Sequence, residues 1–95
     1  MLYTFSQADY AQRELEGYFA NITENDAVVL WQDGVLLAIK YPHYFEQCPA
    51  ECLLLEQDIL ARNLTALLPR ESKVRSITML DFVAITQKFY PQLAL

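Results

Sequence analysis

Three apolar runs along the chain each end near a carboxylate and are followed at once by a helical pattern. The runs and their carboxylates are 28–31 with Asp33, 53–55 with Glu56 and Asp58, and 76–80 with Asp81. Strands that are apolar on both faces belong to parallel sheets with helices above and below, so this pattern predicts an α/β fold. Such sheets gather their loops, and usually their function, along one edge.

The hydrophobic periodicity of the whole chain completes this prediction. We expect strands at 2–5, 27–31, 51–55 and 74–79, and helices at 8–20, 35–39, 57–62 and from Asp81 to Pro91. Ninety-five residues are enough for one domain with a buried core. The expected architecture is a single small three-layer α/β domain over 1–95, with a mostly parallel sheet of four or five strands.

Four short polar side chains stand at the predicted helix starts: Ser6 (with Asp9 three residues on), Asp33, Asp58 and Asp81. Such residues accept hydrogen bonds from the free backbone N–H groups of a helix start, which predicts that all four are helix caps. The three later aspartates also lie at carboxyl ends of strands, where carboxylates can hold Mg²⁺. Capping is favoured because it requires no further partner, so we expect no metal.

Apolar residues make up 54% of the chain and aromatic residues 13%, which are high fractions for so small a domain. Some of that surface is expected to meet another protein. The segment 35–39 is apolar on every side and must be covered by the domain or by a partner. Pro42 pushes Tyr41 into an extended conformation, which predicts an aromatic loop around His43. The predicted partner surface contains Val35, Leu36, Ile39, Tyr41, Tyr44 and Phe45.

The net charge of −5 argues against direct binding of nucleic acid, because the phosphate backbone would be repelled. The cluster of Arg70, Lys73 and Arg75 is interpreted as a solvated loop. The N-terminal segment lacks a basic leader, and no apolar stretch is long enough to span a membrane. With two cysteines and no disulfide framework, the chain is expected to be a reduced, cytoplasmic protein.

The cysteines offer the main candidate chemistry. Cys48 and Cys52, with His43 upstream, supply three possible zinc ligands where a structural site needs four. Cys52 is expected to be a buried hydrophobe, and Glu46 and Glu51 are expected to raise the pKa of Cys48. Two glycines cannot build a phosphate cradle, so neither a cofactor nor a catalytic residue is predicted.

Four segments carry a resemblance to a known family. They are 1–6, 31–35 (Trp-Gln-Asp-Gly-Val), 55–64 (with Asp-x-x-Ala-Arg-x-Leu) and 81–86 (starting Asp-Phe-Val). In this order, near a chain end at residue 95, the sequence resembles the TusB/DsrH family over essentially its whole length. The resemblance implies a fold of the DsrE/DsrF/DsrH type. It also implies a subunit of the TusBCD complex, a dimer of heterotrimers that relays persulfide sulfur toward 2-thiolation of the tRNA wobble uridine.

Departures from the family pattern refine this expectation. Asn63 stands where the family usually has Gly, and Leu95 where an aromatic residue is frequent. The DsrH branch of sulfur oxidisers carries a relay cysteine in the segment that corresponds to 8–26, which has none here. The resemblance therefore implies a non-catalytic, TusB-like structural subunit that binds TusC-like and TusD-like subunits in a heterohexamer. Two alternatives stay open: a thiol-based persulfide carrier using Cys48 or Cys52, and a stand-alone ligand-binding domain.

Overall fold

A computed structural model of the chain describes residues 1–69 and 71–95, so Arg70 of the predicted basic loop lies outside the described residues. Its centre is one five-stranded sheet in the order β4-β3-β2-β1-β5, and every neighbouring pair is parallel. The strands are β1 (Leu2–Phe5), β2 (Ala27–Leu30), β3 (Glu51–Leu55), β4 (Arg75–Ile77) and β5 (Gln92–Ala94). The predicted α/β class and its largely parallel sheet are confirmed.

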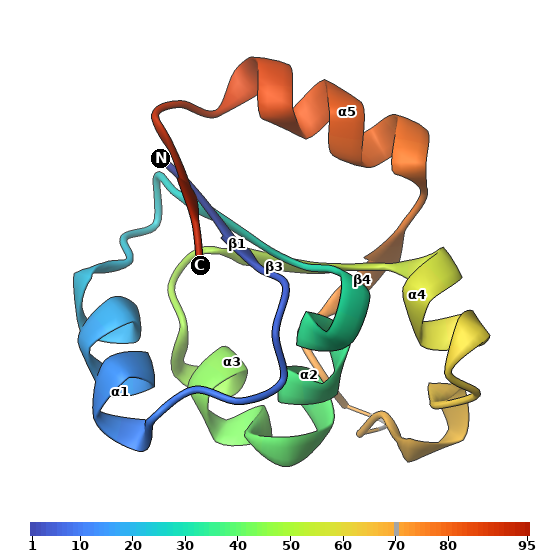
Figure 1. The fold of residues 1–95 in the computed structure, drawn as a ribbon. Helices are drawn as coiled ribbons and strands as arrows, with labels where there is room; N and C mark the ends of the chain where they lie inside the picture. Colours follow the sequence, from blue (N-terminus) through green and yellow to red (C-terminus); the bar gives the residue numbers. More distant parts are fainter. Residues whose placement is uncertain (70) are drawn as a thin grey trace.

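Helices cover both faces of the sheet, which gives three layers. They are α1 (Gln12–Asn21), the 3-10 helix η1 (Gln32–Leu36), α2 (Leu37–Lys40), α3 (Pro42–Gln47), α4 (Glu56–Ala61), the 3-10 helix η2 (Thr65–Leu67) and α5 (Met79–Lys88). Figure 1 shows α1, α2 and α3 on one face and α5 alone across the other. Among the described residues, no helix has the length and apolarity needed to cross a membrane.

Alternate strand residues point to two separate cores. On the side of α1 to α3, Phe5, Leu30 and Leu54 pack with helix residues such as Leu15. Phe19 of α1 stacks on Phe5 at 5.8 Å between ring centroids and meets the Phe45 ring edge-on at 5.2 Å. The second core lies under α5 and consists of Leu2, Ala27, Val29, Leu53, Leu55, Ile77 and Phe82. The strands are therefore buried on both faces, as their unbroken apolar runs predicted.

Several element boundaries differ from the prediction. The expected aromatic loop is helix α3, because Pro42 occupies its first turn, where a proline costs no hydrogen bond. The fourth strand is limited to β4, and α5 begins at Met79, before Asp81. The chain also adds β5 after Pro91, where it pairs with β1 at the edge of the sheet.

Two of the predicted helix caps are corrected at α1 and α5. Helix α1 begins after Ala11, whose N–H donates to Glu14 Oε1 at 3.2 Å. Ser6 is therefore not its cap, and the Ser6 hydroxyl instead donates to the carbonyl of Leu95 at 3.2 Å. At α5 the cap is Thr78, whose Oγ1 accepts from the Asp81 N–H at 3.2 Å. The Asp81 carboxylate accepts from the Thr78 N–H at 3.1 Å, so Asp81 completes this capping box from the third helical position.

Candidate functional site

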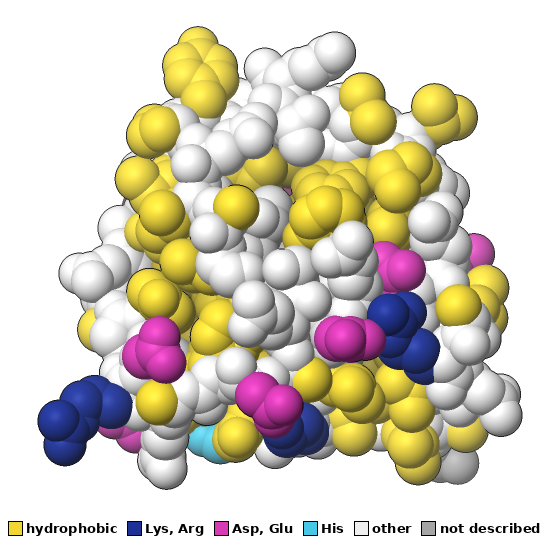
Figure 2. Space-filling view, viewed as in Figure 1, with side chains coloured by type: hydrophobic (Ala, Val, Ile, Leu, Met, Phe, Trp, Pro, Cys, Tyr) yellow, Lys and Arg dark blue, Asp and Glu magenta, His cyan; other side chains and the backbone are white. Residues whose placement is uncertain are grey.

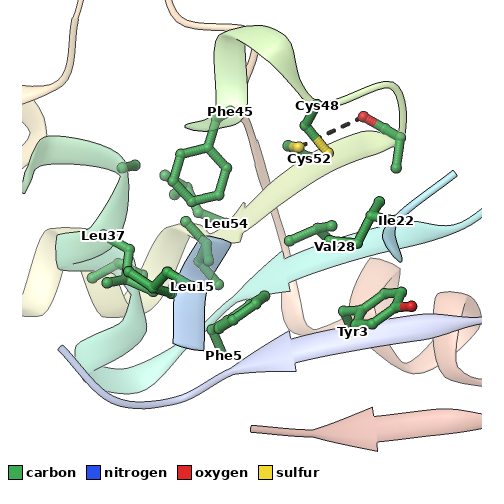
Figure 3. Close-up of a cluster of buried hydrophobic side chains, with 14 of the residues drawn as sticks. Tyr3, Phe5, Leu15, Ile22, Val28, Leu37, Phe45, Cys48, Cys52 and Leu54 are labelled. Carbon is green, nitrogen blue, oxygen red and sulfur yellow. Dashed lines mark hydrogen bonds between the residues drawn. The ribbon is translucent and has the colours of Figure 1, made fainter. Parts of the chain in front are cut away.

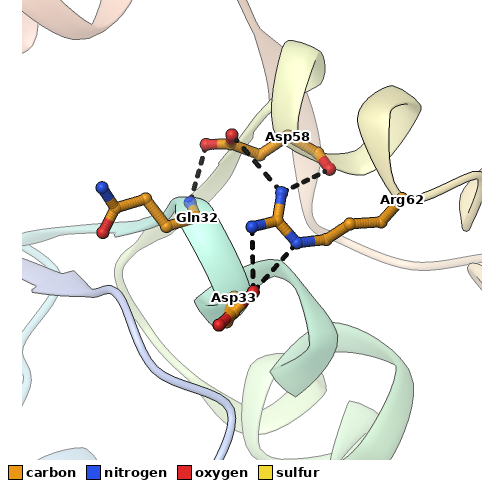
Figure 4. Close-up of polar contacts among 4 residues, drawn as sticks. All are labelled: Gln32, Asp33, Asp58 and Arg62. Carbon is orange, nitrogen blue, oxygen red and sulfur yellow. Dashed lines mark hydrogen bonds and ion pairs between the residues drawn. The ribbon is translucent and has the colours of Figure 1, made fainter.

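The carboxyl ends of β2 and β3 carry a polar network centred on Arg62 (Figure 4). The Arg62 guanidinium donates to Asp33 Oδ1 from Nη2 at 2.8 Å and from Nε at 3.1 Å. Its Nη1 lies 3.5 Å from Asp58 Oδ1 and donates to the Asp58 carbonyl at 3.1 Å. Asp58 Oδ2 accepts from the backbone N–H of Gln32 at 2.6 Å and supports that residue at a φ of 52°. One guanidinium thus pairs with both carboxylates and balances one of their two negative charges.

This network corrects the other two predicted caps. Helix α4 begins after Leu55 with no side-chain cap, and Asp58 lies inside it. The 3-10 helix η1 begins after Trp31, and Asp33 lies in its first turn, bonded to Arg62. Asp58 binds the start of η1 in place of its own helix. Within 1–69 and 71–95, no set of three or more His, Cys, Asp or Glu side chains is arranged to hold a metal ion.

The strand order reverses between β1 and β5, which is where a doubly wound sheet offers a ligand crevice. In this chain the backbone groups at that point form hydrogen bonds with each other. The Ser6 N–H donates to the Leu95 carbonyl at 3.3 Å, and the Leu95 N–H donates to the Thr4 carbonyl at 2.8 Å. These backbone groups are therefore bonded to each other and are not free to receive a ligand.

The predicted partner surface divides into buried and half-buried residues. Val35 is 0% exposed and Phe45 is 2% exposed, so both belong to the core and neither can meet a partner. Ile39, Tyr41 and Tyr44 are half-buried against the same core, and Leu36 is half-buried as well. The apolar segment 35–39 is thus covered largely by its own domain.

Among the described residues, five of the eight exposed large apolar side chains lie on α5 and after it, and the other three are Met1, Leu60 and Leu67. Met79, Leu80 and Val83 project from the outer side of α5, and Leu80 is 82% exposed. Together they form what we call the α5 surface. Tyr90 is 75% exposed and Leu93 is 39% exposed at the neighbouring sheet edge. Figure 2 shows hydrophobic side chains along the upper part of the molecule, where α5 lies. The sequence analysis did not predict this surface, although the sequence contains a signal for it. Helix α5 has apolar residues on two faces: Phe82 faces the core, whereas Leu80 and Val83 face away.

The two cysteines lie close together in the core on the side of α1 to α3 (Figure 3). Cys48 ends α3 and Cys52 is in β3, and both are buried free thiols. Cys52 Sγ donates to the Ala50 carbonyl at 3.6 Å, and Lys73 Nζ donates to the Cys48 carbonyl at 2.8 Å. Cys48 also lies in the wall of a pocket of about 270 Å³. The other residues lining this pocket are Glu16, Phe19, Ala20, Tyr44 and Gln47.

This pairing gives the two thiols opposite acidities. The neighbouring Cys52 thiol, the Ala50 N–H and the charge of Lys73 lower the pKa of Cys48 to about 7, against burial and Asp26. The interaction between the two thiols, together with burial, raises the pKa of Cys52 far above its usual value. The expectation that Glu46 and Glu51 raise the pKa of Cys48 is therefore wrong, because sequence spacing did not reveal the contact between the thiols. Cys52 is buried, as expected.

The comparison with known families decides what the chain is. The family model described as "DsrH like protein" matches residues 7–92. The chain belongs to the DsrH-like family. The TusB/DsrH resemblance of its sequence is thereby confirmed.

Named relatives of this DsrH-like chain extend over its full length. A Haemophilus influenzae protein described as uncharacterized is 64% identical over 95 residues and covers all of both chains. Proteins named TusB from Yersinia pestis and Yersinia pseudotuberculosis are 33% identical over 97 residues and cover 99% of each chain. The solution NMR structure of protein Tm0979 from Thermotoga maritima superposes with a TM-score of 0.61 at 25% identity, covering 93% of each chain.

Proposed function

We propose that this DsrH-like chain is a non-catalytic, TusB-like structural subunit of a cytoplasmic sulfur relay complex that serves 2-thiolation of the tRNA wobble uridine. Its partners in this proposal are TusC-like and TusD-like subunits, arranged as a heterohexamer. Full-length similarity to proteins named TusB supports the proposal. The observation that carries a scaffolding role is the α5 surface, because it presents adjacent apolar side chains that the domain itself leaves uncovered.

Leaving these apolar side chains in contact with water is unfavourable in free energy. Helix α5 covers one whole face of the sheet by itself, with Phe82 directed to the core and Leu80 directed to solvent. Contiguous exposed apolar side chains are typical of a surface that is buried in a permanent assembly. Burying a leucine of this kind stabilises an interface by about 1.5 to 3 kcal/mol. The acidic net charge further favours a protein partner over direct contact with tRNA.

The test is co-expression with TusC-like and TusD-like partners, followed by the native mass of the purified species. We expect a six-chain complex with the unchanged chain. Leu80→Glu should remove this chain from the complex, because a buried carboxylate costs several kcal/mol without a partner charge. Leu60→Glu is the matched control, since Leu60 is 58% exposed on a different helix, α4, and should assemble normally. Normal assembly of Leu80→Glu would contradict the role of the α5 surface.

The half-buried part of the predicted partner surface needs its own variant. Ile39 lies on α2, on the opposite side of the sheet from α5, and the variant to test is Ile39→Glu. Its fold is checked first by circular dichroism, since Ile39 also packs against the core. Loss of assembly with a retained fold would extend the proposed interface to α2. If the unchanged chain stays alone in the presence of both partners, the scaffolding proposal itself fails.

A further inference from the structure

Cys48 and Cys52 combine three features that the scaffolding role leaves unexplained. The two side chains lie close together in the core, and both thiols are free. Cys48 lines a pocket that α1 and α3 form at the surface, whereas Cys52 lies in the inner strand β3. Cys48 therefore borders a pocket of a size that a small molecule can occupy, and Cys52 lies next to it in the core.

The charged groups around the pair favour ionisation of the outer thiol. Lys73, from the segment before β4, reaches the C-terminal end of α3 and lies over the Cys48 carbonyl. The negative charge of Asp26, before β2, acts to raise the pKa of Cys48, and that of Glu51 in β3 acts to raise the pKa of Cys52. Hydrogen bonding and Lys73 prevail at Cys48, whose pKa falls to about 7, so close to half of this thiol is ionised at neutral pH.

We propose that Cys48 and Cys52 form a dithiol site that reduces small neutral or cationic disulfides, with Cys48 as the attacking thiol and Cys52 as the resolving thiol. The nucleophile of such a reaction is a thiolate, and the best attacking thiol is half-ionised near the ambient pH. The site uses residues on the opposite face of the sheet from the α5 surface.

The reaction has two balanced steps. In the first, the Cys48 thiolate attacks one sulfur of the disulfide RSSR, which forms Cys48–S–S–R and expels RS⁻. In the second, Cys52 loses its proton and attacks Cys48 Sγ, which forms the Cys48–Cys52 disulfide and expels the second RS⁻. The two protein thiols lose two electrons, RSSR gains them, and the two cysteine protons leave on two molecules of RSH. Closure brings the sulfur atoms to about 2.05 Å.

The pocket lining defines the class of disulfide. Glu16 is the charged residue of its wall, and Phe19, Ala20 and Tyr44 supply apolar surface. A volume of about 270 Å³ admits a small organic group but not a folded partner. Because Glu16 and the net charge of −5 repel anions, neutral and cationic disulfides should enter in preference to anionic ones.

The first experiment treats the reduced full-length chain with 2-hydroxyethyl disulfide and follows the intact mass and the peptide map. The unchanged chain should lose two hydrogen atoms, release two equivalents of mercaptoethanol and carry a Cys48–Cys52 link. Cys52→Ser should retain one mercaptoethanol on Cys48, and Cys48→Ser should react at least about tenfold more slowly, because Cys52 is buried and is not part of the pocket wall. The rate at which the unchanged chain releases the first mercaptoethanol should rise with pH around a midpoint near 7.

Three results would overturn the proposal. An unchanged chain that keeps the mixed disulfide has no resolving thiol, and a Cys48→Ser variant as fast as Cys52→Ser reverses the roles. Reaction only in urea would mean that the pocket does not admit the reagent. The intact mass and peptide map of the unchanged chain decide the first and third points even where a serine variant fails to fold.

A second experiment tests the pocket itself. Cystamine, a cationic disulfide, should react faster than 3,3′-dithiodipropionate, an anionic one. Glu16→Gln should shrink the ratio of the two rates by roughly 1.5- to 5-fold at low salt, the range of one exposed charge interaction. Glu14→Gln is the matched control on the same helix, because Glu14 is not part of the pocket wall. An unchanged ratio in Glu16→Gln would show that the reagents reach Cys48 by another route.

Discussion

Gly34 lies where two backbone segments meet at the end of β1. A Cβ atom at this position would overlap the Phe5 carbonyl oxygen and come within 2.6 Å of its carbon. Gly34→Ala must therefore push η1 away from the sheet, and we expect a loss of about 3 kcal/mol or more in the free energy of unfolding. Urea denaturation of the purified variant measures this loss.

Gly17 supplies the matched control for that measurement. It lies inside α1, and a methyl group added there would have no heavy atom within 4 Å, so Gly17→Ala adds a group to open space. Because alanine restricts the unfolded chain and favours helix, this variant should be about 0.5–1 kcal/mol more stable than the unchanged chain. Equal stability of the two alanine variants would refute the close approach at Gly34.

The residues at this turn also show how far sequence reasoning reaches. The apolar run 28–31 before Asp33 correctly predicted a strand that ends here, but Gly34 is required for its small size, and the residue of this turn with positive φ is Gln32. Asp58 holds Gln32 from 26 positions away. Local spacing predicted Asp58 as a cap for its own helix, because nothing in the sequence announces a partner in another element.

At the scale of the element, α5 depends on its first turn. Thr78 and Asp81 exchange hydrogen bonds at 3.2 and 3.1 Å, which satisfies two backbone donors at the helix start. Thr78→Ala should cost about 1 kcal/mol of unfolding free energy, within the range of roughly 0.5–2 kcal/mol for such caps. Urea unfolding checks the value, and Thr65→Ala, at an exposed position in η2, should change it little. A loss confined to Thr65→Ala would contradict the capping box.

Elements with long apolar runs were predictable, and short ones were not. The strands β1, β2 and β3 fall where buried runs predicted them, since both faces of a central strand demand apolar residues. The three residues of β5 are exposed and show no such run, because backbone pairing with β1 is enough to hold an edge strand in the sheet. The contact between Cys48 and Cys52 depends on how α3 turns into β3, and a spacing of four residues does not specify that turn.

At the scale of the whole molecule, β5 closes the sheet against β1. The Leu2 N–H donates to the Pro91 carbonyl at 3.0 Å, and the Leu95 N–H donates to the Thr4 carbonyl at 2.8 Å. Deleting residues 90–95 would expose the hydrogen-bonding edge of β1, all of whose side chains are buried. We expect a lower melting temperature and self-association, because an open apolar edge strand recruits other strands.

Size-exclusion chromatography and thermal unfolding test the deletion. Tyr90→Ala is its control, since that change removes an exposed side chain and leaves β5 in place. The control should stay at the elution volume and melting temperature of the unchanged chain. A truncated chain that did the same would show that β1 tolerates a free edge.

The pairing of β5 with β1 also dictates the order of events during protein synthesis. Strands β1 to β4 add to the sheet in the order in which they leave the ribosome, whereas β5 must return past all of them to reach β1. Until β5 pairs with β1, the folding chain therefore displays a nearly complete sheet with one unpaired border. A chaperone or a neighbouring nascent chain could bind there before the protein's own last strand arrives.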